Sequence, residues 1–154
     1  MPADRILRAV DGCGVVVFGL PLDAMARAYA ALAVAVARGD EIPARIAGAI
    51  RTRPFLFGGT DRFDSLVVEE TEGRVISKVG AEGVHSVAVF DQGLGFTIKV
   101  EDGATRAQYP AVLRMLDYLG ALPARLSPRL GEYGRARIRN TRGEVVGELF
   151  AASA

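Results

Sequence analysis

The sequence predicts an α+β domain in which an antiparallel sheet is flanked by helices. The first observation is that two helical patterns come before residue 60. The second is that three segments rich in valine and isoleucine follow between residues 74 and 100. Gly-Ala-Glu-Gly at 80–83 and Asp-Gln-Gly at 91–93 separate these segments, and both are typical turn sequences. The simplest arrangement of the three is an antiparallel meander.

The first forty residues predict one strand and one long helix. A short segment at 5–10 leads to a β-branched run at 15–18, which favours an extended strand. Pro21 suits a turn or the first position of a helix, and Gly39 suits the stop of a helix over 22–38. Small residues lie on every side of that helix, so we expect it to be buried and closely packed.

Two shorter helices are predicted next. Residues 42–53 form the first, and Pro54 ends it. Residues 55–64, with paired glycines at the centre, are predicted to be a loop. Residues 64–70 can form the second short helix.

The predicted sheet and the elements after it complete the domain. The three strands span 74–79, 84–90 and 95–100. Residues 104–119 form an amphipathic helix with leucines and a valine on one side. Residues 137–140 and 145–150 are predicted to close the domain as a hairpin.

Composition limits the class of protein. Residues 1–154 fit a single globular domain with a real core. The net charge of +1 gives no electrostatic basis for nucleic-acid binding. No apolar run spans a bilayer, so we expect no membrane partner. The single cysteine, Cys13, cannot form an internal disulfide, and a cytoplasmic location is the natural expectation.

Three residues could carry chemistry. Cys13 lies between two glycines and could be a zinc ligand or a nucleophile, although most free cysteines are small buried hydrophobes. Asp11 could accept the amino group of a substrate. Lys78 ends a predicted strand, where it could act as a base or an electrostatic clamp, or simply protect a sheet edge.

Other polar residues fit less well. His85 has valine and serine neighbours in a strand pattern, which favours the outer face of the sheet. Ser65, Ser77 and Ser86 are possible nucleophiles, but none lies in a Gly-x-Ser-x-Gly or Ser-x-x-Lys motif.

Several segments together resemble the asparaginase II family, the rhizobial type of bacterial L-asparaginase. They are Asp-Gly-Cys-Gly at 11–14, Gly-Thr-Asp-Arg-Phe at 59–63, Lys-Val-Gly-Ala-Glu-Gly at 78–83 and Arg-Asn-Thr-Arg-Gly-Glu at 139–144. The family pattern has glycine where this chain has Asp61. The matching motifs come in one order over most of the chain.

The resemblance implies a fold similar to serine β-lactamases and glutaminases, and hydrolysis of an amino-acid amide, L-asparagine, to L-aspartate and ammonia. It implies that Lys78 is the catalytic strand lysine, that Asp11, Gly80 and Glu82 bind substrate, and that Cys13 is one zinc ligand. We expect Asp11, Cys13 and Lys78 to converge on one pocket.

The resemblance covers only the C-terminal half of the family pattern. The Ser-x-x-Lys pair, the second serine and the other zinc ligands belong to the missing N-terminal half. We therefore expect the chain alone to be inactive, to bind zinc weakly, and to act with that half or as a homo-oligomer, most simply a homodimer. A non-catalytic binding or structural module is the alternative, and a β-lactamase-like site for another substrate is a third.

Overall fold

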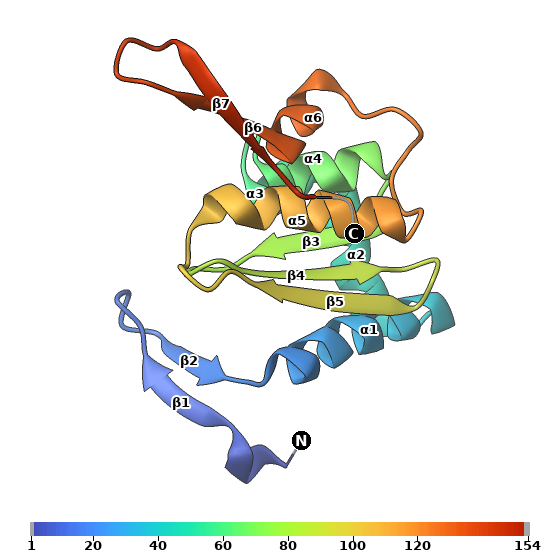
Figure 1. The fold of residues 1–154 in the computed structure, drawn as a ribbon. Coiled ribbons are helices and arrows are strands. Elements are labelled where there is room, and N and C mark those ends of the chain that lie inside the picture. Colours follow the sequence, from blue (N-terminus) through green and yellow to red (C-terminus); the bar gives the residue numbers. More distant parts are fainter. Residues whose placement is uncertain (1, 153–154) are drawn as a thin grey trace.

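A computed structural model describes residues 2–152 and places an antiparallel sheet between two groups of helices (Figure 1). The sheet contains β3 (Val75–Val79), β4 (Val84–Val89) and β5 (Leu94–Lys99), in the order β3-β4-β5. Ser77 pairs with Val87, and Val87 in turn pairs with Phe96. The predicted meander and the predicted α+β class are both confirmed.

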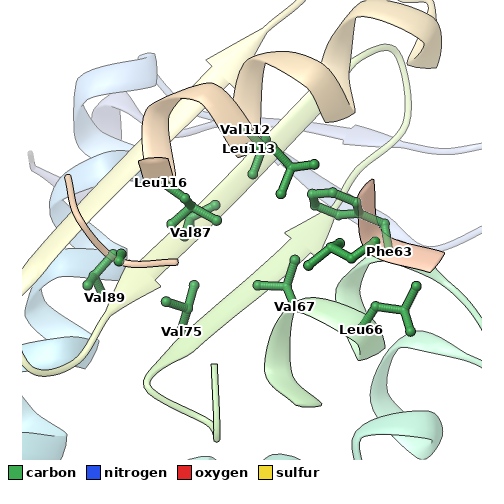
Figure 2. Close-up of a cluster of buried hydrophobic side chains, with 11 residues drawn as sticks. Phe63, Leu66, Val67, Val75, Val87, Val89, Val112, Leu113 and Leu116 are labelled. Carbon is green, nitrogen blue, oxygen red and sulfur yellow. The ribbon is translucent and has the colours of Figure 1, made fainter. Parts of the chain in front are cut away.

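One face of the sheet packs against α4 (Phe63–Glu70) and α5 (Thr105–Tyr118), and this contact forms the main core. Side chains alternate along a strand, so Val75, Val87 and Val89 point to the same face. They meet an apolar cluster from the two helices (Figure 2). The buried helix residues in that cluster are Phe63, Leu66, Val67, Val112, Leu113 and Leu116. Each such side chain contributes about 1.5–3 kcal/mol on burial.

The opposite face packs against α1 (Leu22–Arg38) and α2 (Glu41–Thr52). The predicted bounds of α1 are confirmed. Its close packing is confirmed on one side only, because Gly95 of β5 lets the helix backbone approach. A Cβ added at Gly95 would lie 2.3 Å from the Ala30 nitrogen. The prediction of burial on all sides is wrong, since Ala33 is its only fully buried residue.

Two hairpins stand outside this body (Figure 1). The first pairs β1 (Leu7–Val10) with β2 (Val16–Gly19), so the segment that led to the predicted strand is itself a strand. The second pairs β6 (Arg135–Arg139) with β7 (Val145–Phe150), as predicted. Both strands of the first hairpin are exposed along their length.

Two further helices were not predicted. The expected loop over 55–64 is wrong in its first part, because Pro54 opens the short helix α3 (Pro54–Gly58) at a position where a missing N–H costs nothing. The helix α6 (Pro128–Gly134) precedes the second hairpin. Ser127 caps α6, and its backbone N–H donates to Glu70 Oε2 at 3.0 Å. The Ser127 hydroxyl also donates to Glu70.

Within residues 2–152, no helix combines the length and the apolar character that crossing a bilayer requires.

Candidate functional site

The Lys78 ammonium group lies at the open edge of the sheet. β3 is an edge strand, so one side of it has no strand neighbour. The Lys78 side chain is 42% exposed, and its Nζ donates to the Val79 carbonyl oxygen at 3.1 Å. The same Nζ lies 3.8 Å from Asp64 Oδ2 and 5.8 Å from the centre of the Phe57 ring.

Asp64 is a buried carboxylate in the first turn of α4. Its Oδ2 accepts a hydrogen bond from the Val79 backbone N–H at 2.9 Å, and its Oδ1 accepts one from Ser77 Oγ at 2.9 Å. His85 Nε2 lies 3.2 Å from the same Oδ1. Burial raises the pKa of Asp64, but the hydrogen bonds from His85 and the Val79 amide outweigh burial and leave that pKa below its usual value.

His85 is fully buried, so its predicted place on the outer face of the sheet is wrong. It points to the α4 and α5 side, where its ring meets Phe63 edge-on at 5.4 Å. The neighbours of His85, Val84 and Ser86, do not distinguish an exposed face from a strand that is buried on both faces, which is the case here for β4.

The Asp64, Ser77 and His85 side chains contain the groups of a hydrolytic triad in a different geometry. Ser77 Oγ lies 2.6 Å from His85 Nε2, the same nitrogen that faces Asp64. A triad uses one ring nitrogen for the serine and the other for the acid. Here His85 Nδ1 is buried and has no hydrogen-bond partner within residues 2–152. Ser77 is itself fully buried, so substrate cannot reach it.

Each serine hydroxyl in residues 2–152 is hydrogen-bonded to another group of the protein. Ser65 Oγ donates to the Gly59 carbonyl at 2.7 Å, and Ser86 Oγ is hydrogen-bonded to Thr97 Oγ1 at 3.0 Å. Ser127 is bonded to Glu70. Ser65 and Ser86 are also buried. Ser65, Ser77 and Ser86 are therefore closed to substrate, and the half-buried Ser127 has both its hydroxyl and its backbone N–H bound to Glu70.

Gly80 and Glu82 lie in the turn that follows Lys78. The Gly80 N–H donates to the Val84 carbonyl at 2.7 Å, which closes the turn. Glu82 has a φ of 55°, in the left-handed region, and its side chain is exposed. Its carbonyl accepts a hydrogen bond from Lys99 Nζ at 2.6 Å. The Glu82 carboxylate is thus exposed beside the end of β3.

Asp11 and Cys13 lie in the exposed loop between β1 and β2. Asp11 Oδ1 accepts hydrogen bonds from the backbone N–H groups of Cys13 at 2.9 Å and Val15 at 3.0 Å, which fixes the loop. The Cys13 thiol is exposed, so its interpretation as a buried hydrophobe is wrong. Within residues 2–152, no hydrogen bond or ion pair links this loop to Lys78, and their convergence stays a prediction.

Cys13 alone supplies too few ligands for a zinc site. A structural zinc site takes four ligands, and a catalytic site takes three from the protein. Over the described part of the chain, no group of three His, Cys, Asp or Glu residues is placed to hold a metal ion. Zinc binding through Cys13 stays a prediction.

A surface hollow with a volume of about 600 Å³ lies elsewhere, between α2 and α3. It is lined mainly by apolar groups, including Ile50, Leu56 and Phe57. An amino-acid amide requires polar partners for its carboxylate and amino groups. The exposed polar end of β3 is therefore the better candidate site, although Phe57 borders both places.

Asp64 was not predicted as a site residue from the sequence. It follows the Gly-Thr-Asp-Arg-Phe segment that supports the family resemblance, and that position was a possible signal. An acidic residue in the first turn of a helix is also common for electrostatic reasons, so the pattern alone did not single it out.

The model of the L-asparaginase II family matches residues 1–151. No curated protein matches the chain.

Proposed function

Because this chain belongs to the asparaginase II family, we propose that it supplies the strand-lysine side of an amidohydrolase site. The reaction is the hydrolysis of L-asparagine to L-aspartate and ammonia. The observation that carries the proposal is Lys78, which stands in the family's Lys-x-Gly-Ala-Glu-Gly motif with its ammonium group partly open to solvent.

Lys78 is suited to proton transfer and to charge stabilisation. An ammonium group has three N–H donors, and one of them is used by the Val79 carbonyl. The remaining donors can bind a hydroxyl or the oxygen of an amide that gains negative charge during attack. In this proposal Gly80, Glu82 and Asp11 bind the amino-acid end of the substrate.

The attacking hydroxyl comes from outside the described residues in this proposal. The support is that Ser65, Ser77, Ser86 and Ser127 are each buried or hydrogen-bonded to other groups. A polypeptide with the Ser-x-x-Lys half of the family would supply the nucleophile and its base. The chain alone would then bind part of the substrate without cleaving it.

The test is ammonia release from L-asparagine by the chain alone and by the chain mixed with a Ser-x-x-Lys half of the family. We expect no release from the chain alone and measurable release from the mixture. Lys78→Met should abolish release, while Arg114→Gln, which changes a half-buried side chain of α5, should leave it unchanged. Release that is insensitive to Lys78→Met would exclude the proposed role.

A non-catalytic binding module is the second candidate. It is favoured by the exposed apolar β1–β2 hairpin, which is suited to contact with another surface. In that case a folded mixture would release no ammonia, and Lys78→Met would have no effect on binding of the partner.

We also propose that the chain self-associates as a homodimer in the absence of another partner. Val10, Val16 and Phe18 lie on one face of the β1–β2 hairpin and are 68%, 53% and 61% exposed. Size-exclusion chromatography with light scattering should show a dimer, and Phe18→Asp should shift it to a monomer. A monomer at high concentration would contradict this proposal.

A further inference from the structure

We propose that Asp64 is a positioning residue for Lys78: it holds the ammonium group at the open edge of β3. This inference rests on the proposed function, because positioning has a catalytic meaning only if Lys78 takes part in the reaction. Asp64 itself is 2% exposed and does not contact substrate in this scheme.

Asp64 is fixed by groups other than Lys78. Its Oδ1 accepts a hydrogen bond from Ser77, with His85 also within 3.2 Å, and its Oδ2 accepts one from the Val79 amide. Carboxylates that accept several hydrogen bonds are well compensated when buried. The orientation of this carboxylate is therefore set from inside the protein.

Lys78 has no comparable anchor of its own. Its hydrogen bond goes to the carbonyl of the adjacent residue, Val79, and its other close group is the Phe57 ring. A lysine side chain with four rotatable bonds loses much conformational freedom when it is held in one place. Asp64 Oδ2, at 3.8 Å, is the anion that can restrict it.

The position of Lys78 therefore depends on the buried polar residues, whereas their positions do not depend on Lys78. Ser77 and His85 orient Asp64, and Asp64 orients Lys78. The same Asp64 carboxylate bonds the Val79 N–H on the free side of β3, so the strand and its lysine are positioned by one group. Other ionisable groups near Asp64 are Tyr29 of α1 and Tyr109 of α5. Burial raises the pKa of each, and the Asp64 charge adds to the rise.

The composition of the chain makes this inference easy to test. The chain has only two lysines, Lys78 and Lys99. Nuclear magnetic resonance of ¹⁵N-labelled lysine ammonium groups therefore gives two side-chain signals. Lys99 serves as the internal reference, because its Nζ bonds the Glu82 and Val100 carbonyls instead of a carboxylate.

In the full chain, Asp64→Asn should accelerate exchange of the Lys78 ammonium protons with water by about threefold, in line with the strength of a partly exposed ion pair. The Lys99 signal should not change. The control Asp117→Asn, which removes an exposed acid paired with Arg114, should alter neither signal. A folded Asp64→Asn protein with an unchanged Lys78 signal would overturn the inference.

A second measurement on the unmodified chain covers the case in which Asp64→Asn does not fold. The Lys78 ¹⁵Nζ shift should move on acidification with the same midpoint as the Asp64 carboxyl carbon. Independent titration of the two groups would overturn the inference. Lys78→Met should leave the melting temperature within about 4 °C of the original, because Asp64 keeps its other partners.

Activity separates this inference from the proposed function. In the mixture with a Ser-x-x-Lys half, Asp64→Asn should lower kcat with little change in KM, since it disorders a reacting group without removing a substrate contact. If the unmodified mixture is active and Asp64→Asn leaves kcat intact, positioning is wrong while the proposed function stands. If the unmodified mixture is inactive although Asp64→Asn changes the Lys78 signal, the proposed function is wrong. The contact between Asp64 and Lys78 is then still supported.

Discussion

In the sheet body, Val87 and Leu116 are completely buried, whereas in the β1–β2 hairpin Leu7 and Phe18 are 74% and 61% exposed. The polar groups differ in the same way. Asp64 is enclosed by donors from two strands, while Asp11 bonds only the backbone of its own loop. The body thus has a core of its own, and the hairpin is the region that an additional surface would stabilise. Two-stranded hairpins are marginally stable in isolation.

The largest expected effect comes from truncating the core. Leu116→Ala should lower the free energy of unfolding by about 2–5 kcal/mol, because it leaves a cavity between α5 and the sheet. Phe18→Ala should change it by less than about 0.5 kcal/mol in a monomer. Urea unfolding measures both. Similar losses for the two variants would show that the hairpin is covered.

The close approach of α1 and β5 gives the next effect. Gly95→Ala should cost about 3 kcal/mol, because its Cβ would lie 2.3 Å from the Ala30 nitrogen and the backbone would have to move. The matched control is Gly48→Ala in α2, where an added Cβ meets nothing within 4 Å. That variant should gain about 0.5–1 kcal/mol in helix propensity. Equal stability of the two would contradict the packing of α1 on the sheet.

The buried carboxylate predicts the response to acid. The pKa of Asp64 in the folded chain is lowered, so its ionised form stabilises the fold above the pKa of an unfolded aspartate. That contribution is lost as the pH falls through the lower, folded value. Asp64→Asn should cost about 1.5–3 kcal/mol at neutral pH. The difference between the two proteins in urea unfolding should shrink at acid pH, and a constant difference would argue against an ionised Asp64.

The smallest effects are expected in the hairpin loop. Cys13→Ala should change the free energy of unfolding by less than about 0.5 kcal/mol, because the thiol is exposed. Added zinc should change it by a similarly small amount in the chain alone, since stabilisation scales with affinity. Thermal unfolding with and without a chelator measures this. A clear zinc-dependent rise that Cys13→Ala removes would contradict this expectation, because it would show that the chain alone binds zinc through Cys13.

The body was easier to predict from the sequence than the hairpins were. The strands and α1 have strong local signals: valine-rich runs, turn glycines, and Gly39 after a long alanine-rich helix. The segment 5–10 has a weaker signal, because a strand is defined by its partner and Val17 pairs with Ala9 only in three dimensions. Pro54 was interpreted as the end of one helix, although proline also begins helices.

The residues of the candidate site also differ in how well the sequence predicts them. Lys78 was proposed as a site residue because it lies in a contiguous motif, and the edge position of its strand follows from the meander. Asp64 and His85 were missed or misplaced because their roles depend on contacts across the sheet edge. Burial of a histidine between a valine and a serine has no periodic signature when both faces of β4 are covered. Long-range polar contacts of this kind cannot be read from spacing.

The attachment of α6 to α4 has a consequence for the integrity of the chain. Glu70, at the end of α4, receives both the backbone N–H and the hydroxyl of Ser127, at a separation of 57 residues in sequence. Arg125 is exposed just before this junction, and Leu130 just after it is buried in the core. Trypsin could therefore cleave the polypeptide after Arg125 without separating the two pieces. The hydrogen bonds between Ser127 and Glu70 and the burial of Leu130 would hold them in one noncovalent complex.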